Sequence, residues 1–145
     1  MQAGKAVDSY GLMPGNVIEQ ADAEAAYTLC ELKGPPTWVR LPEDRWPDEW
    51  FKIDNRGNRV PLYNAPVVLL RRALYGHPDA GTYWEMHAEA HLKKVGFELI
   101  SENWPCVHWN SQTKMILIVY VGDMQPSGPR IAMYDTWKAL GKELK

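Results

Sequence analysis

Two aspartates stand where this sequence could hold a carboxylate rigidly. Asp123 follows an apolar run from Met115 to Val121 that is rich in β-branched residues, with one glycine between them. Such a run predicts a buried strand, and Gly-Asp suits a tight turn after it. Asp22 ends the segment Val17–Asp22, which also predicts a strand. A carboxylate at a strand end suits a metal ligand, and a core strand with an ordinary hairpin turn is the alternative interpretation of the Met115–Val121 run.

Three segments, taken in order, carry a resemblance to a known family. Asp22 is followed five residues later by an aromatic residue, Tyr27. Residues 73–85 contain a Leu-Tyr-Gly segment that leads into a predicted helix with a tryptophan, and residues 120–123 are Tyr-Val-Gly-Asp. Together these segments resemble the palm of the copia-type reverse transcriptase of LTR retrotransposons. The resemblance covers residues 17–144.

The resemblance implies an RNA-directed DNA polymerase whose aspartates bind Mg²⁺. In the family, one strand delivers an aspartate and a Tyr-x-Asp-Asp turn delivers two more. Asp22 and Asp123 then correspond to catalytic metal ligands, Tyr27 to the residue that excludes a 2′-hydroxyl, and Tyr120 to a nucleotide-binding residue. Polymerases of this kind hold two divalent ions about 4 Å apart. Nucleic acid is the partner that the family implies.

The glycine at position 122 departs from the family pattern. The family has the first aspartate of its turn at this position, and a glycine has no side chain that can ligate a metal. We therefore expect Mg²⁺ to bind weakly or not at all. Loss of one preorganised electrostatic group predicts a fall in rate of at least about 10³-fold. The sequence thus predicts a palm domain that is catalytically inactive.

The composition bounds the class of protein. The chain has 145 residues, of which 46% are hydrophobic, with seven Trp and seven Tyr, so we expect a packed globular domain. Its net charge of −2 lacks the basic bias that phosphate binding favours. Cys30 and Cys106 are isolated and favour reduced thiols in an intracellular protein, without indicating the compartment. No apolar run approaches the roughly 20 residues that span a bilayer.

The predicted elements give an α+β fold in which an antiparallel sheet carries both aspartates and packs on two helices. The sequence predicts a helix over Pro78–Val95, because Pro and acidic residues occupy its first turns and Gly96 follows its last residue. We expect an N-terminal extension over residues 1–16 and a palm-like domain over residues 17–145, with incomplete fingers and no thumb. The other predicted elements are helices over Ala3–Tyr10, Ala23–Leu32 and Arg130–Leu144, strands over Phe97–Ile100, Val107–Asn110 and Met115–Val121, and a loop over Pro126–Pro129.

A second function stays open beside the polymerase ancestry. The chain could be a non-catalytic scaffold or structural subunit of a larger assembly that kept the palm fold. Trp46, Trp50, Trp104 and Trp109 lie in or near predicted loops, where they could anchor a protein partner. Exposed aromatic patches would favour that function, whereas a basic cleft beside Asp22 would favour nucleic acid. His87 and His91 stand four apart on a helix, and a metal site or surface histidines would both suit this spacing.

Overall fold

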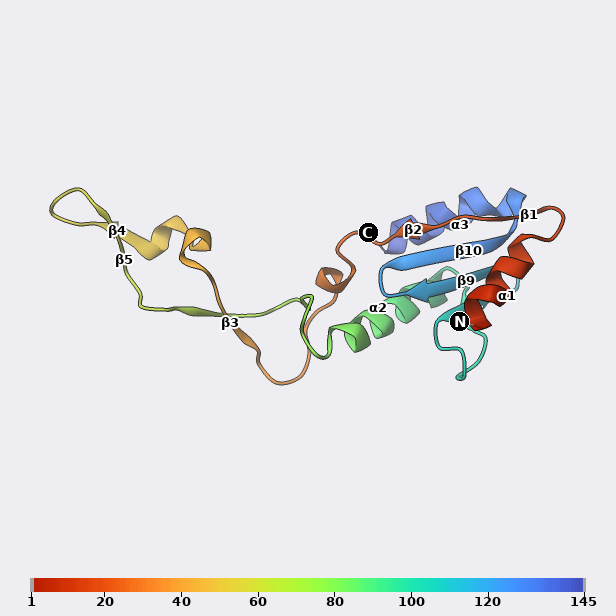
Figure 1. Ribbon diagram of the computed structural model, residues 1–145, viewed down its shortest axis with the longest axis horizontal. Helices are drawn as coiled ribbons and strands as arrows, with labels where there is room; N and C mark the ends of the chain where they lie inside the picture. Colours follow the sequence, from red (N-terminus) through yellow and green to blue (C-terminus); the bar gives the residue numbers. More distant parts are fainter. Residues whose placement is uncertain (1, 145) are drawn as a thin grey trace. The chain divides into compact units, whose positions relative to one another are not determined.

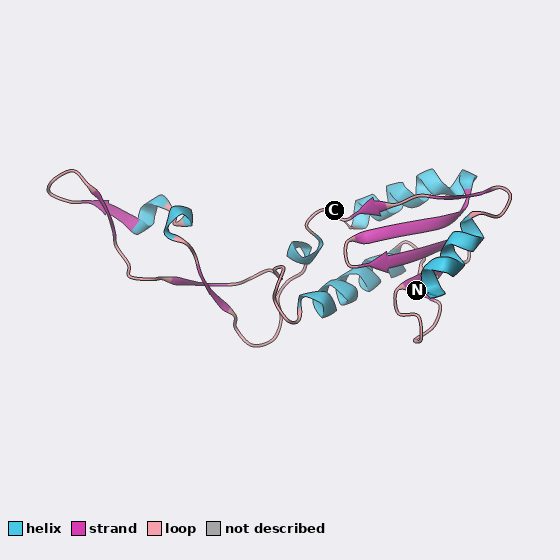
Figure 2. Cartoon of the chain, viewed as in Figure 1, coloured by secondary structure: helices cyan, strands magenta, loops and turns pink. Residues whose placement is uncertain are grey.

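The computed structural model describes residues 2–144 and has α+β architecture with antiparallel sheets. The chain forms two compact units. The first contains the chain up to Glu31 and from Arg72 onward, and the second contains Leu32–Arg71. Figure 2 shows the helices and the main sheet of the first unit. Among the described residues, no helix is long and apolar enough to cross a membrane.

The sheet of the first unit is antiparallel, with the strand order β1-β10-β9-β8-β7, and β2 also pairs with β10. The apolar residues of β9 form its centre, with Met115 and Leu117 fully buried. The predicted strands over residues 97–100, 107–110 and 115–121 are therefore confirmed, each within two residues at its ends. The strands are β1 (Asn16–Ile18), β2 (Ala21–Asp22), β7 (Glu98–Leu99), β8 (Val107–Asn110), β9 (Met115–Tyr120) and β10 (Asp123–Pro129).

Helices cover both faces of this sheet. The helix α1 (Gln2–Gly11) contacts β10 side chains at Gln125 and Ser127, whereas Met124 lies beside α3 (Arg130–Glu143). Neighbouring residues of a strand point to opposite faces, so α1 and α3 lie on opposite sides. Figure 1 shows α1 in front of the sheet, with α2 (Ala80–Lys94) and α3 behind it. The predicted helices over 3–10, 78–95 and 130–144 are confirmed.

The helix α2 has the buried face that its sequence predicts. Ala80, Trp84, Ala88 and Leu92 recur every four residues and are each at most 3% exposed. The helix ends at Lys94, and Gly96 follows its cap with a φ of 83°, a conformation that glycine adopts without a Cβ clash. The backbone N–H of Gly96 donates to the carbonyl of Lys93 at 3.1 Å, which satisfies one of the last carbonyls of the helix.

The second unit consists of two short antiparallel pairs and an aromatic cluster. β3 (Trp38–Arg40) pairs with β6 (Val67–Leu69), and β4 (Phe51–Ile53) pairs with β5 (Arg59–Pro61). Two short 3₁₀ helices, η2 (Glu43–Arg45) and η3 (Asp48–Trp50), precede β4. Trp46 and Trp50 lie edge to face with ring centroids 5.8 Å apart. This contact is one of the favourable arrangements of aromatic pairs.

Two sequence-based predictions are wrong, and a third is confirmed only in part. Residues 23–32 do not form an α-helix, because Ala25 adopts a φ of 54° and only the 3₁₀ helix η1 (Ala26–Leu29) follows. Residues 126–129 are not a loop but the end of β10, since backbone pairing with β9 on one side and β1 on the other overrides their turn-like composition. The strand predicted over residues 17–22 divides into β1 and β2, separated by Glu19 and Gln20.

Candidate functional site: the turn between β9 and β10

A two-residue turn joins β9 to β10. Tyr120 and Asp123 are directly paired, which leaves Val121 and Gly122 as the loop. The positive φ falls on Val121, at 55°, and not on the adjacent glycine. A positive φ at the first loop residue is typical of a type II′ turn, in which glycine usually fills that place. A β-branched residue there is strained, at an expected cost of about 1–3 kcal/mol.

Two neighbouring segments hold this strained turn through its carbonyl groups. The indole Nε1 of Trp84, on α2, donates to the carbonyl of Val121. The backbone N–H of Ala23 donates to the carbonyl of Gly122 at 2.8 Å. Trp84 is only 2% exposed, so packing determines where its N–H points. The helix and the β2 segment therefore both position the turn, without using a side chain at position 122.

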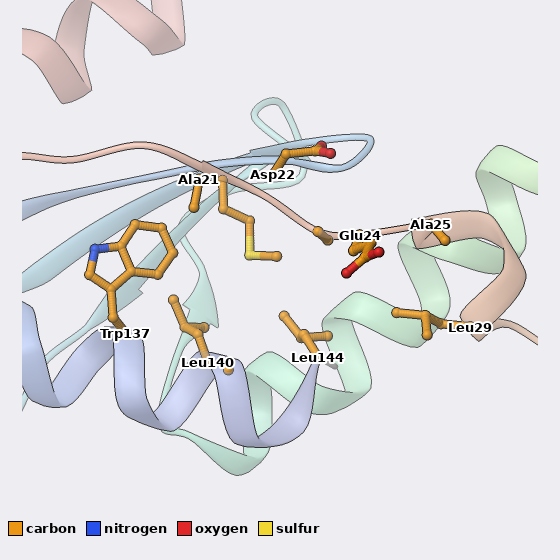
Figure 3. Close-up of a pocket in the computed structure, with 11 residues that line it drawn as sticks. Ala21, Asp22, Glu24, Ala25, Leu29, Trp137, Leu140 and Leu144 are labelled. Atoms are coloured by element: carbon orange, nitrogen blue, oxygen red, sulfur yellow. The ribbon is translucent and has the colours of Figure 1, made fainter.

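The structure brings the two predicted aspartates together. Asp22 and Asp123 are register partners of the antiparallel pair β2–β10. A Cβ atom built at Gly122 would overlap Oδ1 of Asp22 and would lie 3.3 Å from the carbonyl oxygen of Ala23. Figure 3 shows the Asp22 side chain on the far side of its strand from Ala21, turned toward the end of the hairpin. The carboxylate of Asp22 therefore lies against the position that a side chain at residue 122 would take.

The acidic side chains at this turn are those of Asp22 and Asp123. Gly122 supplies no ligand, and Asp123 Oδ1 accepts from Nε2 of Gln20 at 3.5 Å. No group of three or more His, Cys, Asp or Glu side chains with metal-binding geometry occurs within residues 2–144. Mg²⁺ requires near-octahedral oxygen ligation, with one or two carboxylates and the phosphates of a bound substrate. Asp123 is the carboxylate directly opposite Asp22, and position 122 contributes no side chain to the turn.

The two predicted nucleotide-binding tyrosines lie in different surroundings. Tyr120 ends β9 beside the turn and is 72% exposed, so its ring is available to a ligand there. Tyr27 lies on η1, and its ring packs against Tyr75 with a centroid distance of 4.5 Å. Tyr75 belongs to the Leu-Tyr-Gly segment. The Leu-Tyr-Gly segment therefore packs on Tyr27, the aromatic residue five positions after Asp22.

The groove behind Asp22 is apolar. Its volume is about 620 Å³, and it lies between the β2–η1 segment and α3, where Figure 3 shows Leu140 across from Ala21 and Leu144 nearer Glu24. Asp22 and Glu24 are its charged lining residues, and no lysine or arginine among the described residues lines it. It is therefore not the basic cleft that nucleic acid would favour.

The tryptophans and histidines named in the sequence are mostly packed. Trp46, Trp50, Trp104 and Trp109 are all half-buried. The His87 and His91 rings lie 4.2 Å apart, and His91 Nδ1 interacts with the His87 carbonyl at 2.8 Å. Burial lowers the pKa of His87, and the neighbouring His91 charge lowers it further. These contacts explain the histidine pair as part of the packing of α2.

Sequence reasoning did not assign a role to Trp84 or Gln20. Trp84 was visible as the tryptophan of the Leu-Tyr-Gly segment, but its hydrogen bond to the turn depends on how α2 packs on the sheet. Gln20 precedes β2, and its contact with Asp123 depends on the β2–β10 register. No protein-family model, curated protein or solved structure gives a significant match to this chain.

Proposed function

We propose that this chain is a reverse-transcriptase palm-like domain of the copia type whose metal centre has lost a ligand and no longer supports nucleotide transfer. The observation that carries the proposal is the meeting of Asp22 with the Tyr120–Asp123 turn. These segments are far apart in the sequence, and the resemblance requires them to be neighbours. Had they folded to opposite ends of the molecule, the proposal would have no basis.

The surrounding architecture supports the same proposal. Antiparallel strands carry both acidic segments, and α2 and α3 pack on the sheet face opposite to α1. The Leu-Tyr-Gly segment precedes α2, and its Tyr75 contacts Tyr27. All three segments of the resemblance therefore lie in the first unit and are connected by contacts within it. The fold alone does not identify a function, so the acidic turn carries the argument.

The loss of activity follows from the chemistry at position 122. In two-ion catalysis, one ion activates the attacking hydroxyl and the other neutralises the leaving group, and shared carboxylates hold both ions. Gly122 contributes no oxygen, and the space beside it contains Oδ1 of Asp22. Asp22 and Asp123 alone, without a carboxylate at position 122, would not hold the ion pair at a fixed spacing. The chain would then retain the fold of a polymerase palm without its chemistry.

Primer extension tests this proposal. The chain is incubated with a primed RNA template, deoxynucleotides and Mg²⁺ or Mn²⁺, and we expect no extension above that of a heat-inactivated sample. Extension by the natural chain that disappears in the Asp22→Asn variant would contradict the proposed loss of activity. Direct Mn²⁺ binding, measured by electron paramagnetic resonance, should be stronger in the Gly122→Asp variant than in the natural chain. Equal binding would contradict the proposed position of the metal centre.

A second candidate function, a scaffold in a protein assembly, is favoured by the surface of the second unit. Trp38, Ile53 and Val67 are 59%, 68% and 50% exposed, respectively. Exposed apolar groups on so small a unit suit a protein interface better than solvent. Cross-linking mass spectrometry in an extract of the native cells distinguishes the two functions. Protein cross-links confined to residues 32–71 would favour the scaffold, and nucleic-acid cross-links at Tyr120 would favour the polymerase ancestry.

A further inference from the structure

A second cavity lies between α2 and the sheet, separate from the groove in Figure 3. Its volume is about 480 Å³, within the usual range for small-molecule sites. Trp84 and Ala88 line it from α2, Leu99 from β7 and Val119 from β9. The walls are therefore largely apolar and partly aromatic, which suits a small flat ligand.

His108 gives this cavity an unusual polar group. The residue is on β8, lines the cavity and is only 5% exposed, and its Nδ1 has no hydrogen-bond partner among the described residues. A buried polar atom without a partner is uncommon in native proteins and costs about 1–3 kcal/mol. Burial lowers the pKa of His108, although Glu89 and a backbone hydrogen bond with Cys106 oppose the shift. A neutral imidazole has one ring nitrogen that accepts a hydrogen bond. A ligand N–H would satisfy an acceptor of this kind.

The charged lining residues of the cavity are two glutamates, one of which is paired with a lysine at the surface. Glu85 and Glu89 line it, and no lysine or arginine does so within residues 2–144. Glu89 also interacts electrostatically with His108, and Lys93 forms a 2.7 Å salt bridge with Glu89 at the surface. Lys93 partly compensates the charge of Glu89, so Glu85 supplies the uncompensated negative charge that would attract a cationic ligand and repel an anionic one.

We propose that this cavity binds a small planar aromatic base whose N–H groups donate to His108 and Glu89. The aromatic ring lies against Trp84 and Val119, and the positive charge faces the glutamates. The same cavity is lined by Tyr120 and Val121 of the turn, and the Trp84 indole that forms its wall donates to the carbonyl of Val121. A bound ligand therefore contacts the strained turn directly. This site is distinct from the acidic pair and does not depend on the proposed function.

Cys106 provides a natural reporter for this cavity. It lines the cavity and is half-buried, whereas Cys30 is 2% exposed, and burial raises the pKa of the Cys30 thiol. The rate of Cys106 alkylation by iodoacetamide is measured by peptide mass spectrometry with and without benzamidine, a planar aromatic cation. A ligand that fills the cavity slows alkylation by the factor 1 + [L]/Kd, which is about fivefold at about four times Kd. Cys30 is the internal control, and its slow alkylation should not change.

Benzoate is the matched control ligand, because it has the shape of benzamidine and the opposite charge. We expect benzamidine to protect Cys106 and benzoate to leave its alkylation unchanged. The variant His108→Leu should lose most of the protection, and Glu89→Gln, a change near the surface, should weaken it even if the first variant does not fold. Equal protection by both ligands, no protection by benzamidine up to millimolar concentration, or full protection in both variants would overturn the proposal.

Discussion

Replacing Gly122 with aspartate should create a divalent-metal site and make the stability of the chain depend on the metal. The new carboxylate would lie beside Asp22, since a Cβ at position 122 already meets its Oδ1. Two carboxylates about 4 Å apart repel by about 1 kcal/mol in bulk water and about 4 kcal/mol at an effective dielectric constant of 20. Asp22 is exposed, so the lower part of this range applies. We expect a loss of about 1–2 kcal/mol in the free energy of unfolding without metal.

Metal should more than restore this loss. A divalent ion at about 100 times its Kd stabilises the native state by about 2.7 kcal/mol. For a chain of this size that corresponds to a rise in Tm of about 5–10 °C. Thermal unfolding is followed by circular dichroism at constant ionic strength, with MgCl₂ or MnCl₂ replacing NaCl, because screening alone changes the repulsion. The natural chain should show no comparable rise.

The Gly122→Asn variant is the control for this experiment. It has the same shape as the aspartate variant without the charge, so it meets the same steric contact with Asp22 and with the carbonyl of Ala23. The double variant Asp22→Asn, Gly122→Asp removes the carboxylate of Asp22 and keeps that of Asp123. A metal-dependent rise in Tm that is equal in the Asn and Asp variants, or no rise in a folded Asp variant, would refute the interpretation of the turn as a metal centre that lacks one ligand.

Three other predictions concern stability. Replacing Trp84 with Phe leaves the carbonyl of Val121 without its donor and should lower the free energy of unfolding by about 1–3 kcal/mol in urea titrations; an unchanged midpoint would contradict the contact. Replacing residues 32–71 with a short Gly-Ser linker should leave a folded first unit, stabilised by up to about 2 kcal/mol through a shorter loop, and loss of cooperative unfolding would contradict this. Burial lowers the pKa of His108 below its ordinary value of 6.5, so the unfolded chain binds more protons. The free energy of unfolding should therefore fall as the pH decreases from 6.5, and it should fall less steeply in His108→Gln. Glu89, Lys93 and Cys106 are the neighbouring titratable groups. Equal dependence of the free energy of unfolding on pH in the two chains would contradict the assignment.

The elements that sequence patterns predicted well are those in which local chemistry and tertiary structure agree. The helix α2 has a proline before it, glycine after it and a buried residue every fourth position, and its bounds lie within two residues of those predicted. The apolar run of β9 is likewise buried at the centre of the sheet. Residues 126–129 have the composition of a loop, yet they pair on both sides. Neighbouring strands supply hydrogen-bond partners that the local sequence does not indicate.

The position of the candidate site was predictable, but its geometry was not. The family resemblance required Asp22 to lie beside the Tyr120–Asp123 turn, and the β2–β10 register places it there. No pattern in the sequence indicated that Val121, and not the adjacent glycine, would take the positive φ. The carbonyl of Val121 accepts from the Trp84 indole, a contact that α2 makes by packing on the hairpin. Contacts between distant elements, which local rules do not describe, therefore determine the shape of the turn.

The same contacts explain why the fold tolerates a glycine at position 122. The turn is held by the β9–β10 pairing, by the Trp84 indole and by the N–H of Ala23, and none of these uses a side chain at that position. A second carboxylate would add repulsion against Asp22 that only a bound cation offsets. Without it, folding no longer depends on metal, so a chelator should leave the Tm of the natural chain unchanged and lower that of metal-loaded Gly122→Asp. A glycine at position 122 is therefore compatible with every contact that holds the turn.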